Sequence, residues 1–164
     1  MRLADFNALG QDEAQRQLLG CCRAPDWARA VAEGRPYRSM AQLHEAADAA
    51  LTEQHLGDGL AGHPRIGDRR GGDTRSRREQ SRVATAPTSV LDALAEGNRA
   101  YEGRFGHVYL VCASGRGAEE LLAVLRGRLG NDERTERRVV RAELAAINRL
   151  RLDQLLRPEP EVHG

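Results

Sequence analysis

The sequence has 164 residues, a length that suits one domain with a hydrophobic core. Charged residues make up 30% of it, yet the net charge is only +1, so the overall charge does not predict a polyanionic partner. No apolar run approaches the roughly 20 residues that span a bilayer, which argues against a membrane protein. An odd number of cysteines without a signal peptide is typical of reduced thiols, so we expect a cytoplasmic protein.

The N-terminal third is predicted to be helical. A helix over residues 11–22 follows from apolar residues at helical spacing, namely Ala14, Leu18, Cys21 and Cys22. Pro25 suits the first turn of a short helix that carries Trp27 and Val31. Ser39 is followed three residues later by a glutamine, as in a capping box, which predicts that another helix begins there.

The middle of the chain contains a break. Residues 56–73 hold six glycines and a proline, so we expect this stretch to be largely loop. Helix is predicted to resume near Thr74 and to run to about Thr85, because Pro87 then interrupts it.

The C-terminal half is predicted to contain three helices, over residues 89–103, 117–129 and 132–156. Residues 107–113 have the composition of a strand but no evident partner, so we expect an extended segment packed among helices. The tail, 157–164, is expected to be disordered and residues 1–156 to form one domain. The predicted fold is therefore all-α, a compact bundle of about seven to nine helices without a sheet.

Arg151 breaks the pattern of the last helix. At 100° per residue it falls in the middle of the apolar stripe, whose other members are Val140, Leu144, Ile147 and Leu155. A charge on a core stripe is costly unless an anionic group meets it. Arg151 therefore either lines a pocket for an anion, extends to solvent, or pairs with a carboxylate in the core.

His63 and Pro64 lie within the glycine-rich break. A residue before proline is pushed towards extended geometry, so His63 is kept out of regular structure and can face a cleft. Histidine exchanges a proton near neutral pH, which suits an acid/base role, although an ordinary loop histidine is the simpler interpretation. No histidine spacing indicates a zinc site.

Ser76, Glu79 and Gln80 share one face of the helix predicted from Thr74, because they are spaced i, i+3 and i+4. A hydroxyl, a carboxylate and an amide thus converge. The same spacing is also that of a capping box, so an ordinary helix start is an alternative.

Residues 65–82 contain seven arginines and three acidic residues. Such a stretch is either a solvated loop or an anion-attracting rim around a cleft. A helical nucleic-acid-binding module is a further alternative, but the near-zero net charge and the 4% aromatic content argue against a nucleic-acid partner.

Together these features resemble the 2-oxo-4-hydroxy-4-carboxy-5-ureidoimidazoline (OHCU) decarboxylase family. Any one motif is weak, but their shared order over nearly the whole chain is specific. The motifs are Phe6-Asn7-Ala8-Leu9, Cys21-Cys22 followed by Trp27, Gly62-His63-Pro64-Arg65-Ile66-Gly67, Ser76-x-x-Glu79-Gln80, Asn98-x-x-Tyr101, Phe105-Gly106, Val111-Cys112, Arg128-Leu129-x-Asn131-Asp132-x-x-x-Glu136 and Leu150-Arg151-Leu152-x-x-Leu155.

The resemblance implies an all-helical fold and a role for each matching residue. His63 matches the catalytic histidine and Glu79 the acidic residue beside it, while Pro64 matches the proline that shapes the histidine loop. The residues that match substrate-holding positions are Ser76, Gln80 and Arg151, and backbone groups near Leu110 are expected to contact substrate as well. Arg65 departs from the family pattern, which often has an aspartate there.

The implied reaction is decarboxylation of OHCU to (S)-allantoin in urate degradation. Loss of CO₂ leaves carbanion or enolate character that the substrate can delocalise, so no cofactor and no metal are expected. The expected partner is this small-molecule substrate, with no nucleic acid and no membrane, and the resemblance also implies a homodimer. Action of the same fold on another ureide or cyclic carboxylate is the alternative.

Overall fold

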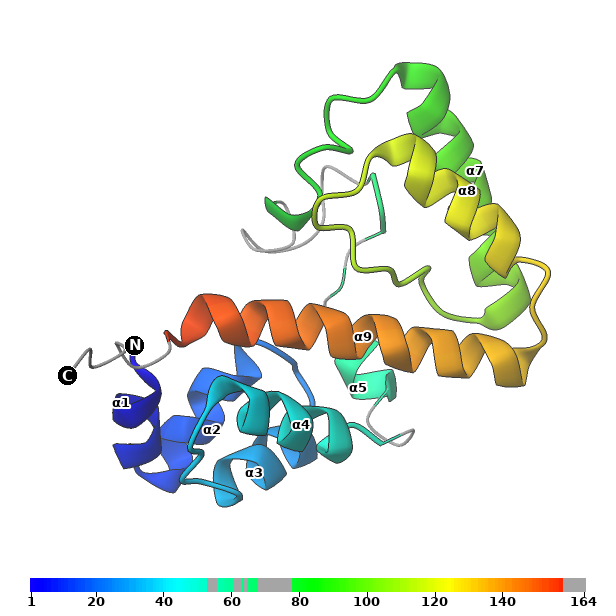
Figure 1. The fold of residues 1–164 in the computed structure, drawn as a ribbon. Coiled ribbons are helices and arrows are strands. Elements are labelled where there is room, and N and C mark those ends of the chain that lie inside the picture. Colours follow the sequence, from blue (N-terminus) through cyan, green and yellow to red (C-terminus); the bar gives the residue numbers. More distant parts are fainter. Residues whose placement is uncertain (53–55, 61–62, 64, 68–77, 158–164) are drawn as a thin grey trace. The chain divides into compact units, whose positions relative to one another are not determined.

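A computed structural model describes residues 1–52, 56–60, 63, 65–67 and 78–157. These residues form eight helices and no sheet, which confirms the predicted all-α fold (Figure 1). The chain divides into two compact units: unit 1 comprises Met1–Gly59 and Ala145–Gly164, and unit 2 comprises Leu60–Leu144. In the described part of the chain, no helix is long and apolar enough to cross a bilayer.

Unit 1 contains the N-terminal helices α1 (Leu3–Ala8), α2 (Gln11–Leu19), α3 (Pro25–Glu33) and α4 (Met40–Ala50). The predicted start signals are confirmed, because Pro25 is the first residue of α3 and the Ser39 side chain accepts the Gln42 N–H at the start of α4. Trp27 is fully buried and donates its indole N–H to the Ala47 carbonyl, 2.9 Å away, which ties α3 to α4.

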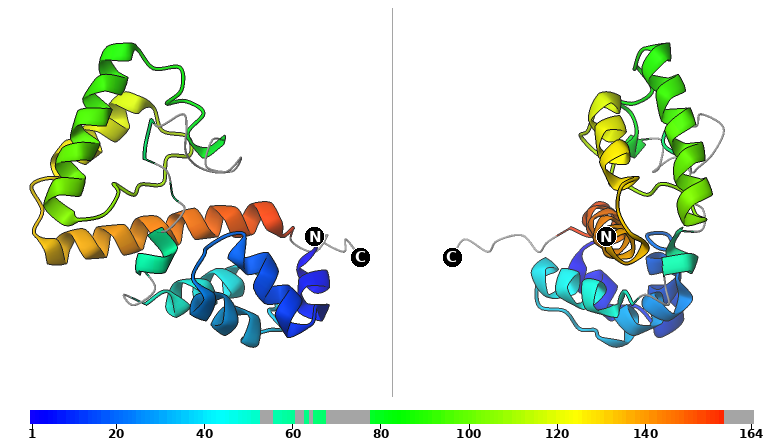
Figure 2. Two further views of the ribbon diagram at one scale, coloured as in Figure 1. Left: turned by 180° about the vertical axis from the view of Figure 1, so that it is seen from behind. Right: turned by 90° about the vertical axis from the view of Figure 1, so that its right-hand side faces the viewer.

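Unit 2 is built around α7 (Thr88–Phe105) and α8 (Ala118–Arg128), which pack side by side (Figure 2). Gly97 permits this close approach, since a Cβ there would lie 2.6 Å from a Leu125 methyl carbon. Residues 107–113 belong to the segment that connects these helices along the chain and have no helix or strand, as predicted. The core of the unit is aromatic and aliphatic, with Tyr101, Tyr109, Leu94, Leu121 and Leu125 all buried.

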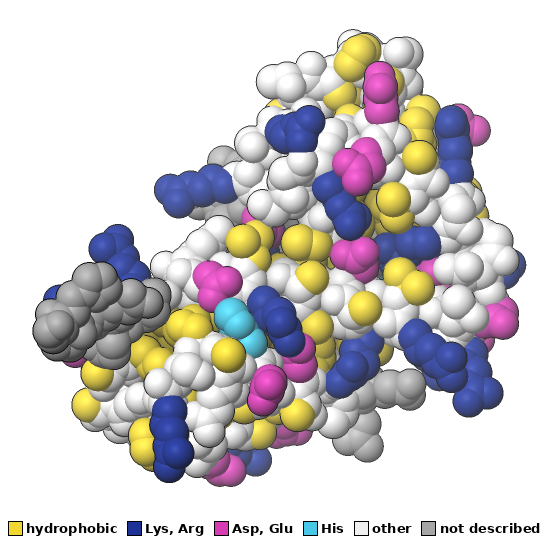
Figure 3. Space-filling model, viewed as in Figure 1, with side chains coloured by type: hydrophobic (Ala, Val, Ile, Leu, Met, Phe, Trp, Pro, Cys, Tyr) yellow, Lys and Arg dark blue, Asp and Glu magenta, His cyan; other side chains and the backbone are white. Residues whose placement is uncertain are grey.

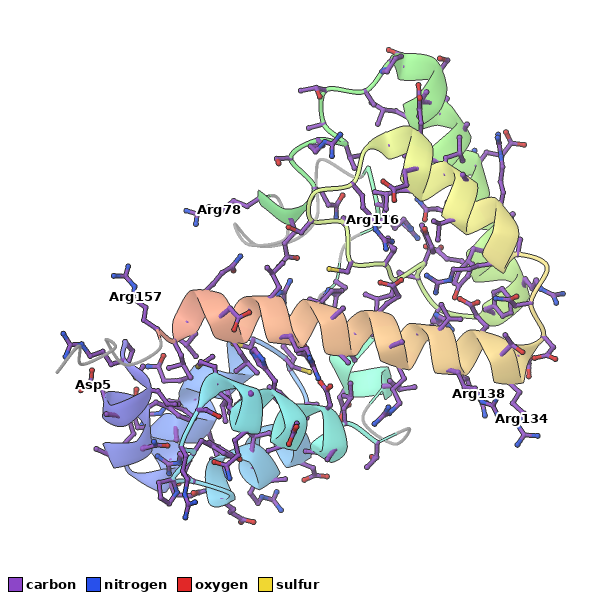
Figure 4. The ribbon with its side chains drawn as sticks, viewed as in Figure 1. Asp5, Arg78, Arg116, Arg134, Arg138 and Arg157 are labelled. Carbon is purple, nitrogen blue, oxygen red and sulfur yellow. The ribbon has the colours of Figure 1, made fainter. Side chains whose placement is uncertain are left out.

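The last helix, α9 (Glu133–Leu155), contributes its first part to unit 2 and its last part to unit 1. Arg134 and Arg138 project from its exposed side (Figure 4). At its end, the Arg157 N–H donates to the Met1 carbonyl at 2.8 Å and the Leu3 N–H donates to the Arg157 carbonyl at 3.1 Å, so the two ends of unit 1 are joined through their backbones. The rest of the tail, 158–164, lies outside the described residues.

Two expectations about the middle of the chain are wrong in part. The stretch predicted as loop contains a short helix, α5 (Leu56–Leu60), which buries Leu56 and Gly59. The helix predicted over 74–85 is not continuous, because residues 80–85 form turns; residues 74–77 lie outside the described part. These turns are held by i to i+3 backbone bonds such as Val83 N–H to the Gln80 carbonyl, 3.0 Å, and the side chains of Gln80 and Arg82 also make tertiary hydrogen bonds.

Candidate functional site

The loop that carries His63 is fastened to unit 2 by two side chains. His63 is half-buried, and its own N–H donates to the Leu60 carbonyl at 3.2 Å. Asn98 of α7 donates its Nδ2 to the Ile66 carbonyl at 3.0 Å, and the Gly67 N–H donates to Gln80 Oε1 at 3.0 Å. The histidine thus belongs to an anchored loop, which is what an acid/base group needs in order to keep its position.

Gln80 joins two regions that the sequence analysis singled out separately. Its amide oxygen accepts the Gly67 N–H, so the turn that follows Glu79 is bound to the loop that follows His63. Gly67 has a φ of +85°, a conformation that glycine adopts without strain.

Arg65, the residue that departs from the family pattern, pairs with α7. Its Nε lies 2.6 Å from Glu102 Oε1 and its Nη2 lies 3.0 Å from Glu102 Oε2, so the two side chains form a bidentate ion pair. This hydrogen bonding holds the pKa of the Glu102 carboxyl below its ordinary value. Arg65, in the arginine-rich stretch, is therefore paired within the protein. Arg82 of the same stretch donates to the Gly115 carbonyl.

Glu79 lies near the segment 107–113. It is half-buried, and its negative charge contributes to the raised pKa of the Cys112 thiol, for which burial is the largest cause and Glu143 a second. The charge of the predicted acid therefore acts on a residue of the segment predicted to touch substrate.

Leu110 is 3% exposed, and its carbonyl accepts a hydrogen bond from Arg128 Nη1 at 2.6 Å. Arg128 forms a buried ion pair with Glu136, with its Nε 2.7 Å from Glu136 Oε1, and Tyr101 donates its hydroxyl to the same carboxylate. The guanidinium also lies 4.9 Å from the centre of the Tyr109 ring. Sequence reasoning assigned no role to Arg128 or Glu136. The available signal was Glu136, four residues before Val140 on the apolar stripe of α9.

Arg151 lies in unit 1 and is buried, with 5% exposure, so the alternative that its side chain extends to solvent is wrong. Its Nη1 donates to the Cys21 carbonyl at 3.2 Å.

Asn148, one turn earlier and 2% exposed, has no nitrogen or oxygen partner for its amide among the described residues. The Asn148 amide makes a hydrogen bond with the Cys22 thiol. Burial raises the pKa of this thiol. Hydrogen bonding to the Ala24 backbone and to Asn148, together with the charge of Arg151, lowers the pKa and so offsets part of that effect. Sequence reasoning missed Asn148, although it falls on the same stripe as Leu144 and Arg151.

The predicted site residues are distributed over both units. His63, Glu79, Gln80 and Leu110 belong to unit 2, whereas Arg151 belongs to unit 1. Pro64 and Ser76 lie outside the described residues. The anchoring bonds connect the His63 loop with Gln80, but the convergence of His63 and Glu79 with Arg151 stays a prediction. Where side chains are described, no group of three or more His, Cys, Asp or Glu residues could hold a metal ion.

The fold is shared with solved structures. A crystal structure of OHCU decarboxylase in the presence of (S)-allantoin superposes with a TM-score of 0.74 at 29% identity, covering 89% of this chain and 98% of that one. A crystal structure of (S)-allantoin synthase superposes with a TM-score of 0.73 at 17% identity, covering 95% of this chain and 54% of that one, a likeness of fold alone. The protein is thus of the all-α class that these structures define.

Sequence comparison then identifies the family. The model of the OHCU decarboxylase family matches residues 7–153, so the chain belongs to the OHCU decarboxylase family. The chain is similar to the uric acid degradation bifunctional protein TTL of Arabidopsis thaliana, with 31% identity over 157 residues, 90% of this chain and 46% of that protein. It is also similar to 2-oxo-4-hydroxy-4-carboxy-5-ureidoimidazoline decarboxylase of Amia calva, with 33% identity over 144 residues, 82% of each chain. The chain therefore spans about half the length of the Arabidopsis protein.

Proposed function

We propose that this protein is a carboxy-lyase of uric acid degradation that converts OHCU to (S)-allantoin without a cofactor. The observation that carries the proposal is the family match over residues 7–153, which includes every residue singled out for the site, from His63 to Arg151. The solved decarboxylase of the same fold, almost all of which this chain covers, supports the same reaction.

The chemistry asks for charge stabilisation and a proton rather than for an electron sink. When the carboxylate leaves as CO₂, the electron pair of the broken C–C bond passes into the adjacent unsaturated ring. A proton delivered to one face of the resulting carbanion equivalent completes the reaction and sets the configuration of the product. Groups already in position for this task lower the barrier because they need no reorganisation during the reaction.

His63 is proposed as the general acid/base. The anchoring of its loop by Asn98 and Gln80 supports this role, because proton transfer requires a group held within hydrogen-bond reach of the reacting atom. Glu79 is proposed to orient the imidazole or to hold the substrate hydroxyl. Its position beside the segment 107–113 is consistent with either task.

Arg151 is proposed to bind an anionic oxygen of the substrate. A guanidinium that is 5% exposed has lost most of its hydration, so an anion that reaches it is bound strongly. Ser76 and Gln80 are proposed to hold the ring and ureido groups, together with Pro64, which shapes the loop, and the backbone near Leu110. A related ureide or cyclic carboxylate is the alternative substrate, since Arg65 changes the side chain beside the His63–Pro64 pair.

The test is freshly prepared OHCU followed by circular dichroism, in which the wild-type chain should produce one enantiomer of allantoin. His63→Asn should reduce turnover by about 10²- to 10⁴-fold while the unfolding temperature stays close to that of the wild type. His44→Asn is the matched control, because His44 is a half-buried histidine of unit 1 that pairs with Asp153. Near-normal turnover of the His63 variant would exclude its acid/base role, and an inactive wild type would exclude the function itself.

Two further proposals concern the state of the protein. We expect a homodimer in a cytoplasmic setting, with the small-molecule substrate as its principal partner. Light scattering on the purified protein would give its mass. A nucleic-acid role is less well supported, because basic and acidic side chains intermingle on the face shown in Figure 3, and salt-dependent binding to duplex DNA would be needed to revive it.

A further inference from the structure

The loop after His63 lies along helix α7. The Ile66 carbonyl accepts the Asn98 amide at 3.0 Å, and the Ile66 side chain, 5% exposed, belongs to the hydrophobic core of unit 2. One residue further on, a Cβ at Gly67 would lie 4.0 Å from a methyl carbon of Leu94. The loop therefore runs antiparallel to α7 and rests on it at both of these residues.

Arg65 continues this attachment towards His63. Its guanidinium forms the bidentate ion pair with Glu102, at 2.6 and 3.0 Å. Glu102 and Asn98 are spaced i and i+4 on α7, so they share one face of the helix. From Ile66 back to Arg65 the contact on α7 moves by one turn, from Asn98 to Glu102. The same face of one helix therefore holds two consecutive residues of the loop.

This ion pair lies close to His63 along the chain. Arg65 follows His63 by two residues, and the residue between them in the sequence is a proline. Proline has the most restricted backbone of all residue types and also restricts the residue before it, so a restraint at Arg65 is passed on to His63. On the other side, the His63 N–H donates to the Leu60 carbonyl at 3.2 Å. Among the described attachments to α7, the ion pair is the nearest to the imidazole in sequence.

The charge of Arg65 is balanced within the protein. Two of its nitrogen atoms donate to Glu102, and this hydrogen bonding lowers the pKa of the Glu102 carboxyl, which keeps the carboxylate charged. A guanidinium that faces a carboxylate at this distance attracts a second anion only weakly. An effect of Arg65 on the reaction is therefore better explained by the position of the loop than by attraction of an anionic substrate.

We propose that Arg65 and Glu102 are positioning residues for the reaction: their ion pair fixes the loop on α7 beside His63 and so holds the imidazole where it transfers a proton. The inference rests on the proposed function and makes it more specific. Arg65, where the family often has an aspartate, thereby serves the acid/base group rather than the choice of substrate.

Three variants separate position from charge. Glu102→Ala removes the partner and leaves the Arg65 charge in place, whereas Arg65→Glu places two carboxylates opposite each other. The double variant Arg65→Glu with Glu102→Arg exchanges the two side chains and restores opposite charges. Glu96→Ala is the matched control for Glu102→Ala, because Glu96 is an exposed glutamate of the same helix.

Steady-state kinetics on OHCU give the first measurement. We expect Glu102→Ala to lower kcat by about 3- to 5-fold, the upper range for a partly exposed ion pair. KM should stay within about twofold of the wild type, as for a change that acts on the chemical step. Arg65→Glu should lower kcat further, because repulsion replaces attraction. The exchanged pair should recover most of the lost kcat, and Glu96→Ala should match the wild type.

NMR spectra of ¹⁵N-histidine-labelled protein give a measurement that does not depend on turnover. The His63 signal is identified by its loss in His63→Asn. We expect this signal to shift in Glu102→Ala and Arg65→Glu, to return towards its wild-type position in the exchanged pair, and to stay unchanged in Glu96→Ala. Unfolding temperatures should stay within about 3 °C of the wild type, since an exposed pair contributes little to global stability.

Several results would overturn the inference. One is an unchanged kcat together with an unchanged His63 signal in Glu102→Ala. Another is a raised KM with unchanged kcat in Arg65→Glu, which would make Arg65 a residue that attracts substrate. A third is an exchanged pair that folds but recovers no activity.

Two further outcomes keep the test decisive. If the exchanged pair does not fold, Glu102→Ala compared with Glu96→Ala still decides between a positioning role and none. If the wild-type chain does not convert OHCU at all, the proposed function fails, and the response of the His63 signal then tests the attachment of the loop by itself.

Discussion

The two units each bury one arginine to the same extent, and the surroundings of the two side chains differ. Arg128 and Arg151 are both 5% exposed. Arg128 in unit 2 is surrounded by a carboxylate, a peptide carbonyl and two tyrosine rings. Arg151 in unit 1 donates to the Cys21 carbonyl and lies near the Cys22 thiol, which also contacts the Asn148 amide. Burial by itself therefore does not distinguish a structural arginine from one proposed to bind substrate.

The largest effect is expected from removing the structural arginine. Arg128→Met leaves the Glu136 carboxylate, which is 1% exposed, buried without its ion-pair partner. We expect a loss of about 3–5 kcal/mol in the free energy of unfolding, measured by urea denaturation.

The double variant Arg128→Met with Glu136→Leu serves as the control, because it removes both charges. It should be more stable than the single variant, since an uncompensated buried charge costs more than a missing ion pair. If the single and double variants unfold together, the ion pair does not account for the stability of this part of unit 2.

Arg151→Met is expected to reduce turnover without reducing stability. Turnover of OHCU should fall by about 10²- to 10³-fold, as when one charge-stabilising donor is lost from an active site. The free energy of unfolding should stay equal or increase, because an apolar side chain suits the stripe formed by Leu144 and Ile147. If Arg151→Met fails to fold, Arg151 is needed for stability as Arg128 is, and the predicted difference between the two arginines is wrong.

The smallest effect concerns the buried asparagines of the two units. Asn98→Leu in unit 2 removes the donor to the Ile66 carbonyl and should lower stability by about 1–3 kcal/mol, since that carbonyl then loses its partner. Asn148→Leu in unit 1 removes an amide that lacks nitrogen and oxygen partners among the described residues, and should change stability by less than about 1 kcal/mol or increase it. Thermal unfolding of both variants side by side measures the difference, and equal destabilisation would contradict it.

Helix positions were predictable because they depend on neighbours along the chain. The starts at Pro25 and after Ser39, and the unpaired segment 107–113, all follow from local composition and capping. The helix predicted up to Thr85 gives way to turns at residues 80–85, where the Gln80 side chain bonds to the Gly67 N–H. Local propensity cannot anticipate a bond to a residue 13 positions away.

By itself, the sequence determined the all-α class, the family, and the presence of a charge at Arg151 on an apolar stripe, since each depends on residue type and spacing. Only the tertiary structure decided which buried polar groups meet: Gln80 with Gly67, Arg128 with Glu136 and the Leu110 carbonyl, and Glu143 with the Cys112 N–H. The physical reason is that a periodic pattern shows that a side chain is buried, whereas the folded chain alone determines which donor and acceptor are close enough to compensate the loss of water.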